Sequence, residues 1–349
     1  MRKSDKDNIR QNWGRTYTLL PKLDLLKVQK DSYKWFQETA ISEILQEISP
    51  VEDFTEKNWS LSFDAYRFGK QTTTPQIALN KGITYDAPLY VKTTLLNKKT
   101  GKTQSQEVFL GDIPQMTERG TFIVNGIERA VVNQLVRSPG VFFTATQDAV
   151  TGKTLYSAEI RPVHGSWLEF STTRHTTITV KIDRRRKFLI STFLKALGLG
   201  TNEDIKERFA EGEESYIDAT LAKDETQNET EALVEIFKKM HPGEPIVLER
   251  VRENFNALFF NNRRYDLGEV GRHKLNKKLE TTPGFKASSQ RVLALEDIIG
   301  TVNYLLMLVE GKGTIDDIDS LANRRVRSVG ELVATTAFRV GVLRLERSI

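Results

Sequence analysis

The chain has 349 residues, of which 39% are hydrophobic and 28% are charged, so it is long enough for two domains with substantial cores. It contains no cysteine, which excludes disulfides, cysteine-based zinc sites and thiol nucleophiles. The formal net charge of +5 is modest for this length. The polar start and the lack of any apolar stretch of about 18 residues predict neither a signal peptide nor a membrane span, and we expect a cytoplasmic protein that does not contact a membrane.

The first part of the chain predicts helices followed by a sheet. Apolar residues recur at helical spacing from Leu23 to Ser49, and we expect two helices with a break near 38–40. Short alternating runs from Leu61 to Phe109 predict a twisted antiparallel sheet. The strand expected at Gly120 to Val124 is followed by Asn125-Gly126, a pair that is typical of a hairpin turn.

The remainder predicts a second sheet and then helices. Strands are expected between residues 155 and 190, most clearly the hairpin of 164–170 and 177–182. Helical patterns follow, and the tail presents an apolar face from Val329 to Leu345. The predicted helices are 188–197, 230–239, 293–310 and 329–349. The fold class is therefore predicted to be α+β.

Motifs for catalysis are not found. Thr151–Thr154 (TGKT) and Gly101–Thr103 (GKT) lack the earlier glycine that a phosphate-binding loop requires, so hairpin turns are favoured. The aspartates Asp316, Asp317 and Asp319 lack calcium-loop spacing, which favours the first turn of a helix. The histidines lack metal-ligand spacing. We expect no catalytic residue and no metal site in this chain.

Charge is segregated along the chain. Residues 203–235 carry twelve acidic and three basic side chains, whereas 181–187 and 263–278 each have a net charge of +4. If 181–187 forms a strand, Arg184 and Arg186 share one face. Such arginines are either solvated surface or contacts to nucleic-acid phosphates, and the pattern leaves both open.

Two further features have a structural and a functional interpretation. Arg324 and Arg325 follow Asp319 closely, so an internal ion pair is as reasonable as a phosphate contact. Trp167 is expected on a strand, where a core position is favoured over an exposed platform for an unstacked base.

The stretch Gly120 to Phe143, GTFIVNGIERAVVNQLVRSPGVFF, resembles the β subunit of bacterial multisubunit RNA polymerase. Other stretches that are similar to this family follow the same order along the chain. They are DSYKWF (31–36), ISPVEDF (48–54), YDAPLYV (85–91), LGDIPQMT (110–117), GSWL (165–168), IDRRRK (182–187), PGEP (242–245), RYDL (264–267), GRHK (271–274), DDIDSLANRRVRSVGE (316–331) and 338–346. Gln115 and Val136 depart from the usual family residues, but neither is a proposed ligand.

The resemblance implies two mixed α/β domains, with a lobe inserted into a protrusion. The protrusion would comprise residues 1–136 and 319–349, and the lobe residues 137–318. Together they would form one jaw of the cleft that holds downstream DNA and the transcription bubble. The chain also looks truncated before the fork loop and the main rifamycin-binding cluster of the family.

The resemblance also implies site residues, none of them catalytic. A pocket for an unstacked non-template guanine would be lined by Arg137, Trp167, Asp183, Asp319 and Arg324. The DNA backbone would be contacted by Arg184, Arg186, Arg264, Arg272 and Lys274. Arg129 and Val132 match positions near the rifamycin region.

The expected partners are DNA, the β′, α and σ subunits of RNA polymerase, and the remainder of the β subunit, in a nucleoid-associated assembly. RNA synthesis from nucleoside triphosphates would be performed by that assembly. No cofactor is expected in this chain, because Mg²⁺ would be held by the β′ subunit. The alternative is a free-standing interaction module from a split or truncated β-subunit gene that docks other polymerase parts through the 329–345 face. An independent enzyme is the least favoured class.

Overall fold

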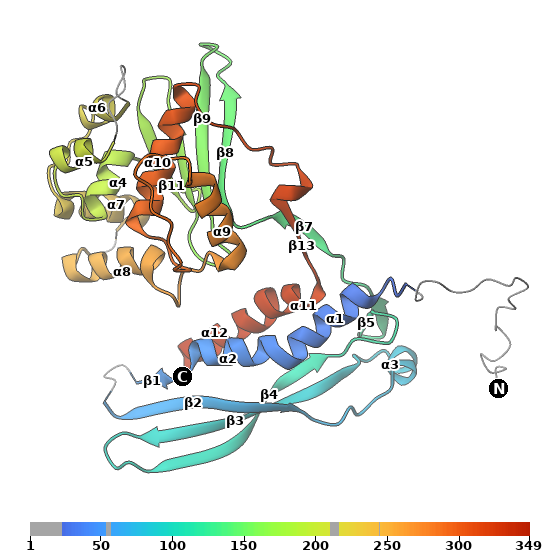
Figure 1. The fold of residues 1–349 in the computed structure, drawn as a ribbon. Coiled ribbons are helices and arrows are strands. Elements are labelled where there is room, and N and C mark those ends of the chain that lie inside the picture. The colour runs from blue at the N-terminus through green and yellow to red at the C-terminus, as the bar shows by residue number, and fades with distance from the viewer. Residues whose placement is uncertain (1–22, 54–56, 210–215, 244) are drawn as a thin grey trace, which may run out of the picture. The chain divides into compact units, whose positions relative to one another are not determined.

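The computed structural model describes residues 23–53, 57–209, 216–243 and 245–349. The polar start of the chain and part of the acidic segment, residues 210–215, therefore lie outside the described residues. The chain divides into two compact units: unit 1 is Met1–Gln134 with Arg327–Ile349, and unit 2 is Leu135–Val326. Each contains helices and antiparallel strands (Figure 1), which confirms the α+β fold class. These divisions differ from the expected domain limits, which lay at residues 136 and 319.

Unit 1 contains a four-stranded antiparallel sheet in the order β1-β2-β3-β4 within its described residues. The strands are β1 (Val51–Glu52), β2 (Trp59–Phe68), β3 (Asp86–Asn97) and β4 (Thr103–Pro114). The sheet was predicted, but the helix α3 (Pro75–Lys81) was not. Thr74 caps α3 and proline occupies its first turn, a combination that favours helix initiation. The Gly101–Thr103 motif lies at the β3–β4 turn, as expected.

The Asn125-Gly126 hairpin joins β5 (Phe122–Val124) to β6 (Ile127–Arg129), which confirms the turn. Both turn residues have positive φ, 51° for Asn125 and 74° for Gly126. A Cβ atom at Gly126 would lie 2.5 Å from the Cα of Gly82. Glycine is therefore required here by backbone conformation and by space.

The first helices of unit 1 are continuous. The predicted break near 38–40 is wrong, because α1 (Lys27–Trp35) passes through a π-helical turn, Phe36–Ala40, directly into α2 (Ile41–Ile48). A π-turn keeps helical dihedral angles while it adds a residue, so the apolar face changes phase without a break.

The C-terminal helices pack onto this helix. After α11 (Val329–Leu332) a second π-helical segment leads into α12 (Arg339–Ser348). The alternative interpretation expected the tail to present an apolar face from Val329 to Leu345 as an interface. The structure buries part of this face in the core of unit 1, namely Val329, Ala334, Phe338 and Val342, whereas Leu332, Val333, Leu343 and Leu345 are partly exposed.

Unit 2 contains a five-stranded antiparallel meander in the order β12-β11-β10-β9-β8 within its described residues. The strands are β8 (Gly140–Gln147), β9 (Thr154–Arg161), β10 (Leu168–Thr172), β11 (Ile178–Ile182) and β12 (Lys187–Leu189). The Thr151–Thr154 motif lies at the β8–β9 turn, as expected, and the β10–β11 hairpin is also confirmed.

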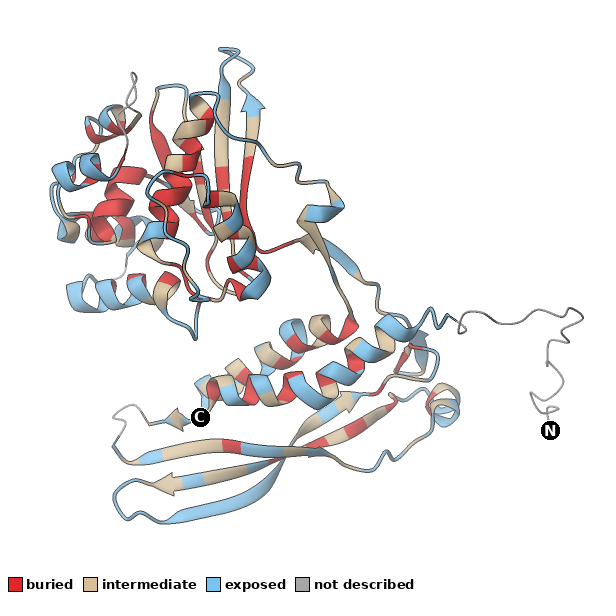
Figure 2. Cartoon of the chain, viewed as in Figure 1, coloured by how far each residue is buried: buried red, intermediate tan, exposed pale blue. Residues whose placement is uncertain are grey.

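Helices pack with this sheet around a large apolar core (Figure 2). They are α4 (Ile190–Ala196), α5 (Asn202–Arg208), α6 (Tyr216–Leu221), α7 (Glu229–Met240), α8 (Leu248–Phe260), α9 (Gly268–Leu279) and α10 (Leu295–Val309). Three of the predicted helices correspond to α4, α7 and α10, although α4 begins later than expected because Lys187–Leu189 forms β12. The helices α5, α6, α8 and α9 were not predicted.

A short two-stranded sheet contains both points at which the chain changes from one unit to the other, 134/135 and 326/327. It pairs β7 (Gln134–Arg137) with β13 (Arg324–Arg327), and the 3₁₀ turn Leu321–Asn323 precedes β13. The Ser138 backbone N–H donates to the Asn323 carbonyl oxygen at 2.9 Å. This pairing sets Arg137 and Arg324 on neighbouring strands, although they are far apart in sequence.

Candidate nucleic-acid interface

The turn between β11 and β12 carries three of the predicted site residues, Asp183, Arg184 and Arg186. It was expected to continue as a strand, but β11 ends at Ile182, so the strand interpretation of Arg184 and Arg186 is wrong. Asp183 and Arg184 instead have φ values of 50° and 57°. Non-glycine residues adopt this left-handed conformation rarely, and aspartate is among those that tolerate it best.

Hydrogen bonds to Trp167 hold Asp183 in this conformation. One carboxylate oxygen of Asp183 accepts from the Trp167 backbone N–H and the other from the Ser166 hydroxyl, each at 2.8 Å. The Asp183 N–H donates to the Trp167 carbonyl oxygen at 3.0 Å. A carboxylate has about four acceptor positions, so these bonds leave acceptor capacity for a ligand.

Trp167 immediately precedes β10 and is half-buried, so its interpretation as a core residue on a strand is wrong. Two guanidinium groups lie over its ring, with the Cζ atom of Arg161 at 4.3 Å and that of Arg184 at 4.7 Å from the ring centroid. Both distances are within the range of cation–π attraction.

A charged network on β9 and β10 holds the arginines. Glu159 and Glu169 are directly opposite each other on these strands, an arrangement that is unfavourable for like charges without compensation. Glu159 compensates by accepting from Arg137 and from Arg161, both at 2.9 Å. Glu169 accepts from Arg184 at 3.3 Å. Burial lowers the pKa of the Arg161 guanidinium, and Glu159 acts in the opposite direction.

The remaining predicted pocket residues form a second group. Arg324 on β13 pairs with Asp319 and donates to the Ile318 carbonyl oxygen at 3.3 Å, so the ion pair, one of the two alternatives for this arginine, is present. Asp319 is strongly exposed. All five predicted pocket residues belong to unit 2. Arg137 and Arg161 both pair with Glu159, Arg161 lies over Trp167, and the Trp167 N–H donates to Asp183. Strand pairing places Arg324 on the strand beside that of Arg137.

The predicted DNA-backbone residues fall into different environments. Arg184, Arg186 and Arg264 are exposed. Lys274 is half-buried, and its ammonium donates to the Ala322 carbonyl oxygen at 2.8 Å, so it fixes the turn before β13. Burial lowers the pKa of Lys274, and Asp316 partly offsets this.

Arg272 must be removed from that set. Its guanidinium is buried, pairs with Asp297 at 2.8 Å and donates to the carbonyl oxygens of Gln290 and Val292. Because each of the three guanidinium nitrogens donates to an acceptor inside the protein, Arg272 supports the packing of α9 on α10.

The aspartate-rich segment does not begin a helix, so that expectation is wrong. Asp316 pairs with Lys278 at 2.8 Å and accepts from the Phe143 N–H, while Asp317 accepts from the Asp319 N–H. Within the described parts of the chain no three His, Asp or Glu side chains gather as metal ligands. The described helices include none that is both long and apolar enough to cross a membrane.

Arg129 and Val132 lie in unit 1, and both are exposed. Arg129 ends β6, and Val132 follows it in an irregular segment.

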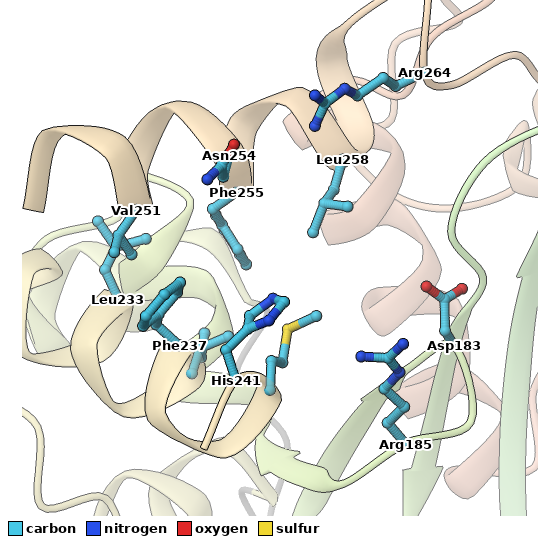
Figure 3. A pocket seen from close by; sticks show the side chains of 12 residues that line it. Asp183, Arg185, Leu233, Phe237, His241, Val251, Asn254, Phe255, Leu258 and Arg264 are labelled. Carbon is cyan, nitrogen blue, oxygen red and sulfur yellow. The ribbon is translucent and has the colours of Figure 1, made fainter. Parts of the chain in front are cut away.

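A pocket of about 330 Å³ is lined in part by Asp183 and Arg185 of the β11–β12 turn. Figure 3 shows Asp183 and Arg185 facing side chains of α7 and α8 across it, with Arg264 near its edge. Its floor is apolar, and the lining includes Phe237, Met240 and Phe255. Asp183 therefore borders both this pocket and the Trp167 network.

Sequence reasoning missed Glu159 and Arg161. The signal was present, because residues two apart on a strand point to the same face, and an acidic and a basic residue at that spacing pair readily. Their importance depends on Trp167, however, and no local pattern connects β9 with the residue before β10.

Comparisons with known proteins show the family of the chain. The family model described as RNA polymerase Rpb2, domain 2, matches residues 137–327. The DNA-directed RNA polymerase subunit beta of Chloroflexus aggregans is 42% identical over 355 aligned residues, covering 93% of this chain and 29% of that protein. The subunit of the same name from Dehalococcoides mccartyi is 41% identical, covering 95% and 27%. The chain thus spans under a third of the length of these curated relatives.

Proposed function

Because the chain belongs to the family of RNA polymerase Rpb2, domain 2, we propose that it is the front part of the β subunit of a DNA-directed RNA polymerase and holds DNA beside the transcription bubble. Unit 1 then corresponds to the protrusion and unit 2 to the lobe. Nucleotidyl transfer belongs to the complete assembly. The partners are the β′, α and σ subunits and the remainder of β, and the β′ subunit holds the Mg²⁺.

The observation that carries this proposal is the connected group of Arg137, Trp167 and Asp183. A guanidinium, an aromatic ring and a carboxylate are joined through Glu159, Arg161 and hydrogen bonds of 2.8–3.0 Å. An aspartate accepts hydrogen bonds from the Watson–Crick edge of guanine, an arginine donates to its O6 and N7 atoms, and an aromatic ring stacks on the base. The group therefore suits an unstacked guanine. Arg324, which pairs with Asp319, lies on the strand that is paired with the strand of Arg137.

The exposed arginines suit the phosphates of the same DNA. Arg184, Arg186 and Arg264 are exposed residues, and Arg184 is held by Glu169 at 3.3 Å. Such contacts add affinity without sequence preference and weaken with salt. Lys274 contributes mainly by fixing the Leu321–Asn323 turn, since its ammonium is already bonded there.

The test is the lifetime of promoter complexes formed by the reconstituted polymerase with a full-length β subunit. Templates carry guanine or adenine at the downstream edge of the non-template strand. We expect Asp183→Asn to reduce the preference for guanine by about 1–3 kcal/mol, the range of one specific base contact. Trp167→Ala removes a ring on which either purine can stack, so it should shorten the lifetime on both templates. Arg252→Gln is the control, because Arg252 is a similarly exposed arginine paired with Glu229. Equal losses on both templates for Asp183→Asn would contradict the guanine pocket.

A second candidate is the free-standing module that docks other polymerase parts. It is favoured by an apolar groove of about 570 Å³ in unit 1, lined by residues that include Phe36, Leu110, Phe338 and Leu345. Phe36 and Phe338 are buried at this groove, whereas Leu110 and Leu345 are partly exposed, and a solvent-accessible apolar groove commonly marks a protein contact. The test is whether this chain, expressed separately, restores assembly when the remainder of β is supplied. Failure to assemble would exclude a separate module.

A further inference from the structure

The two guanidinium groups over Trp167 are held very differently. The Arg161 side chain is 12% exposed, lies on β9 and bonds to Glu159 at 2.9 Å. The Arg184 side chain is 61% exposed, lies on the left-handed turn and bonds to Glu169 at the longer distance of 3.3 Å. Holding a long exposed side chain in one geometry costs entropy, and an exposed ion pair contributes little to offset it.

The positions of these two guanidinium groups also limit where a base can stack on the Trp167 ring. A base that stacks on Trp167 needs one face of the indole. Arg161 and Arg184 both lie over the ring, at 4.3 and 4.7 Å, so a base that takes the place of either guanidinium group on the indole must displace it. The exposed, weakly paired Arg184 is the one that can leave with the smaller loss.

We propose that Arg161, held by Glu159, is a fixed positioning residue for Trp167, and that Arg184 is a displaceable cover that exchanges with an unstacked base. This inference rests on the proposed function. When a base displaces Arg184, the freed guanidinium contacts a phosphate of the same strand. Stacking at Trp167 and phosphate binding at Arg184 are therefore coupled.

Physical considerations favour the exchange. A base stacked on an aromatic ring is held more strongly than an exposed cation over the same ring, and an arginine–phosphate contact is charge-assisted and can be bidentate. Both gains follow from one rotation of the Arg184 side chain. Arg161 cannot make the same move without leaving Glu159, which also holds Arg137.

The experiment measures binding of the reconstituted polymerase to bubble DNA that carries either guanine or an abasic site on the non-template strand. The base contribution is the ratio of the two Kd values, and the salt slope reports phosphate contacts. We expect Arg161→Gln to lower the ratio about tenfold with an unchanged salt slope, although Arg161 touches no DNA. Arg184→Gln should keep or raise the ratio while the slope falls by about one.

Two further variants serve as controls. Arg161→Lys keeps the charge beside Glu159 but loses the planar group, so we expect an intermediate ratio. It also carries the test if Arg161→Gln fails to fold, which thermal melting detects. Arg252→Gln should change neither quantity.

The outcomes distinguish failure of the proposed guanine pocket from failure of the roles proposed for Arg161 and Arg184. A wild-type ratio of one contradicts the proposed guanine pocket itself. A high wild-type ratio that Arg161→Gln leaves unchanged overturns only the positioning role. If Arg184→Gln lowers the ratio as much as Arg161→Gln does, Arg184 is part of the stacking platform and not a cover.

Discussion

Arg272 and Arg161 both pair with carboxylates in unit 2, yet their surroundings differ. Arg272 is buried between α9 and α10, where Asp297 and two carbonyl oxygens occupy its donors. Arg161 is on the sheet, where its guanidinium also covers the half-buried Trp167. The same residue type thus stabilises the fold where the helices enclose it, whereas beside Trp167 it is proposed to position a ring for a ligand.

The largest expected effect is at the buried pair. Arg272→Met should destabilise the protein by about 3–5 kcal/mol, because it leaves the Asp297 carboxylate buried and unpaired. The free energy of unfolding from urea titration measures this. A double variant, Arg272→Met with Asp297→Asn, should recover part of the loss, since the asparagine is neutral and can still cap α10 at Ala294. No recovery would mean that packing, not charge, dominates.

A second buried pair, Lys195–Asp224, predicts a pH dependence. Burial alone would raise the pKa of Asp224, but hydrogen bonds from Thr226 and Lys195 lower it below its ordinary value. Because the pKa of Asp224 is lower in the folded state, its charged form stabilises the protein at pH values above about 3.9, the ordinary pKa of an aspartate. This stabilisation is lost as the pH falls through the folded-state pKa.

Asp224→Asn should therefore be less stable than wild type at pH 7 and should lose less stability on acidification. Urea midpoints between pH 7 and pH 3 test this. Parallel curves for the two proteins would show that Asp224 does not contribute to acid unfolding.

In the partly exposed network beside Trp167, Glu159→Gln should affect DNA binding more than folding. It weakens the bonds to Arg137 and Arg161 together, so we expect about a tenfold loss of guanine preference. The free energy of unfolding should change by about 1 kcal/mol or less, as is usual for a partly exposed pair. A large loss of stability with the preference retained would place Glu159 with the buried pairs.

The smallest effect is expected at Arg264. Its exposed guanidinium is proposed to contact phosphate, so Arg264→Gln should reduce the salt slope of DNA binding by about one, equally for guanine and adenine. Salt titrations of both templates measure this. A base-dependent change would instead indicate that Arg264 acts through the pocket it borders with Asp183.

Features governed by neighbours in sequence were predicted best. The helix Leu295–Val309 follows from apolar periodicity and the Asn125-Gly126 hairpin from turn chemistry, and short separation made the Asp319–Arg324 pair one of two alternatives. Errors arose where distant residues decide. Asp183 leaves the strand because it bonds to Trp167, and the helix Lys27–Ile48 continues through a π-turn because its apolar residues meet those of the C-terminal helices.

The sequence by itself determined the α+β class, most strands and helices, and the residue types suited to a base and to phosphates, because periodicity, turn residues and motifs act over short distances. Only the tertiary structure decided which arginines are available. Arg272 and Arg264 lie in the same basic stretch, yet packing of α9 on α10 buries the first and leaves the second exposed. Burial and pairing depend on what folds against a side chain, and that is set by the whole chain.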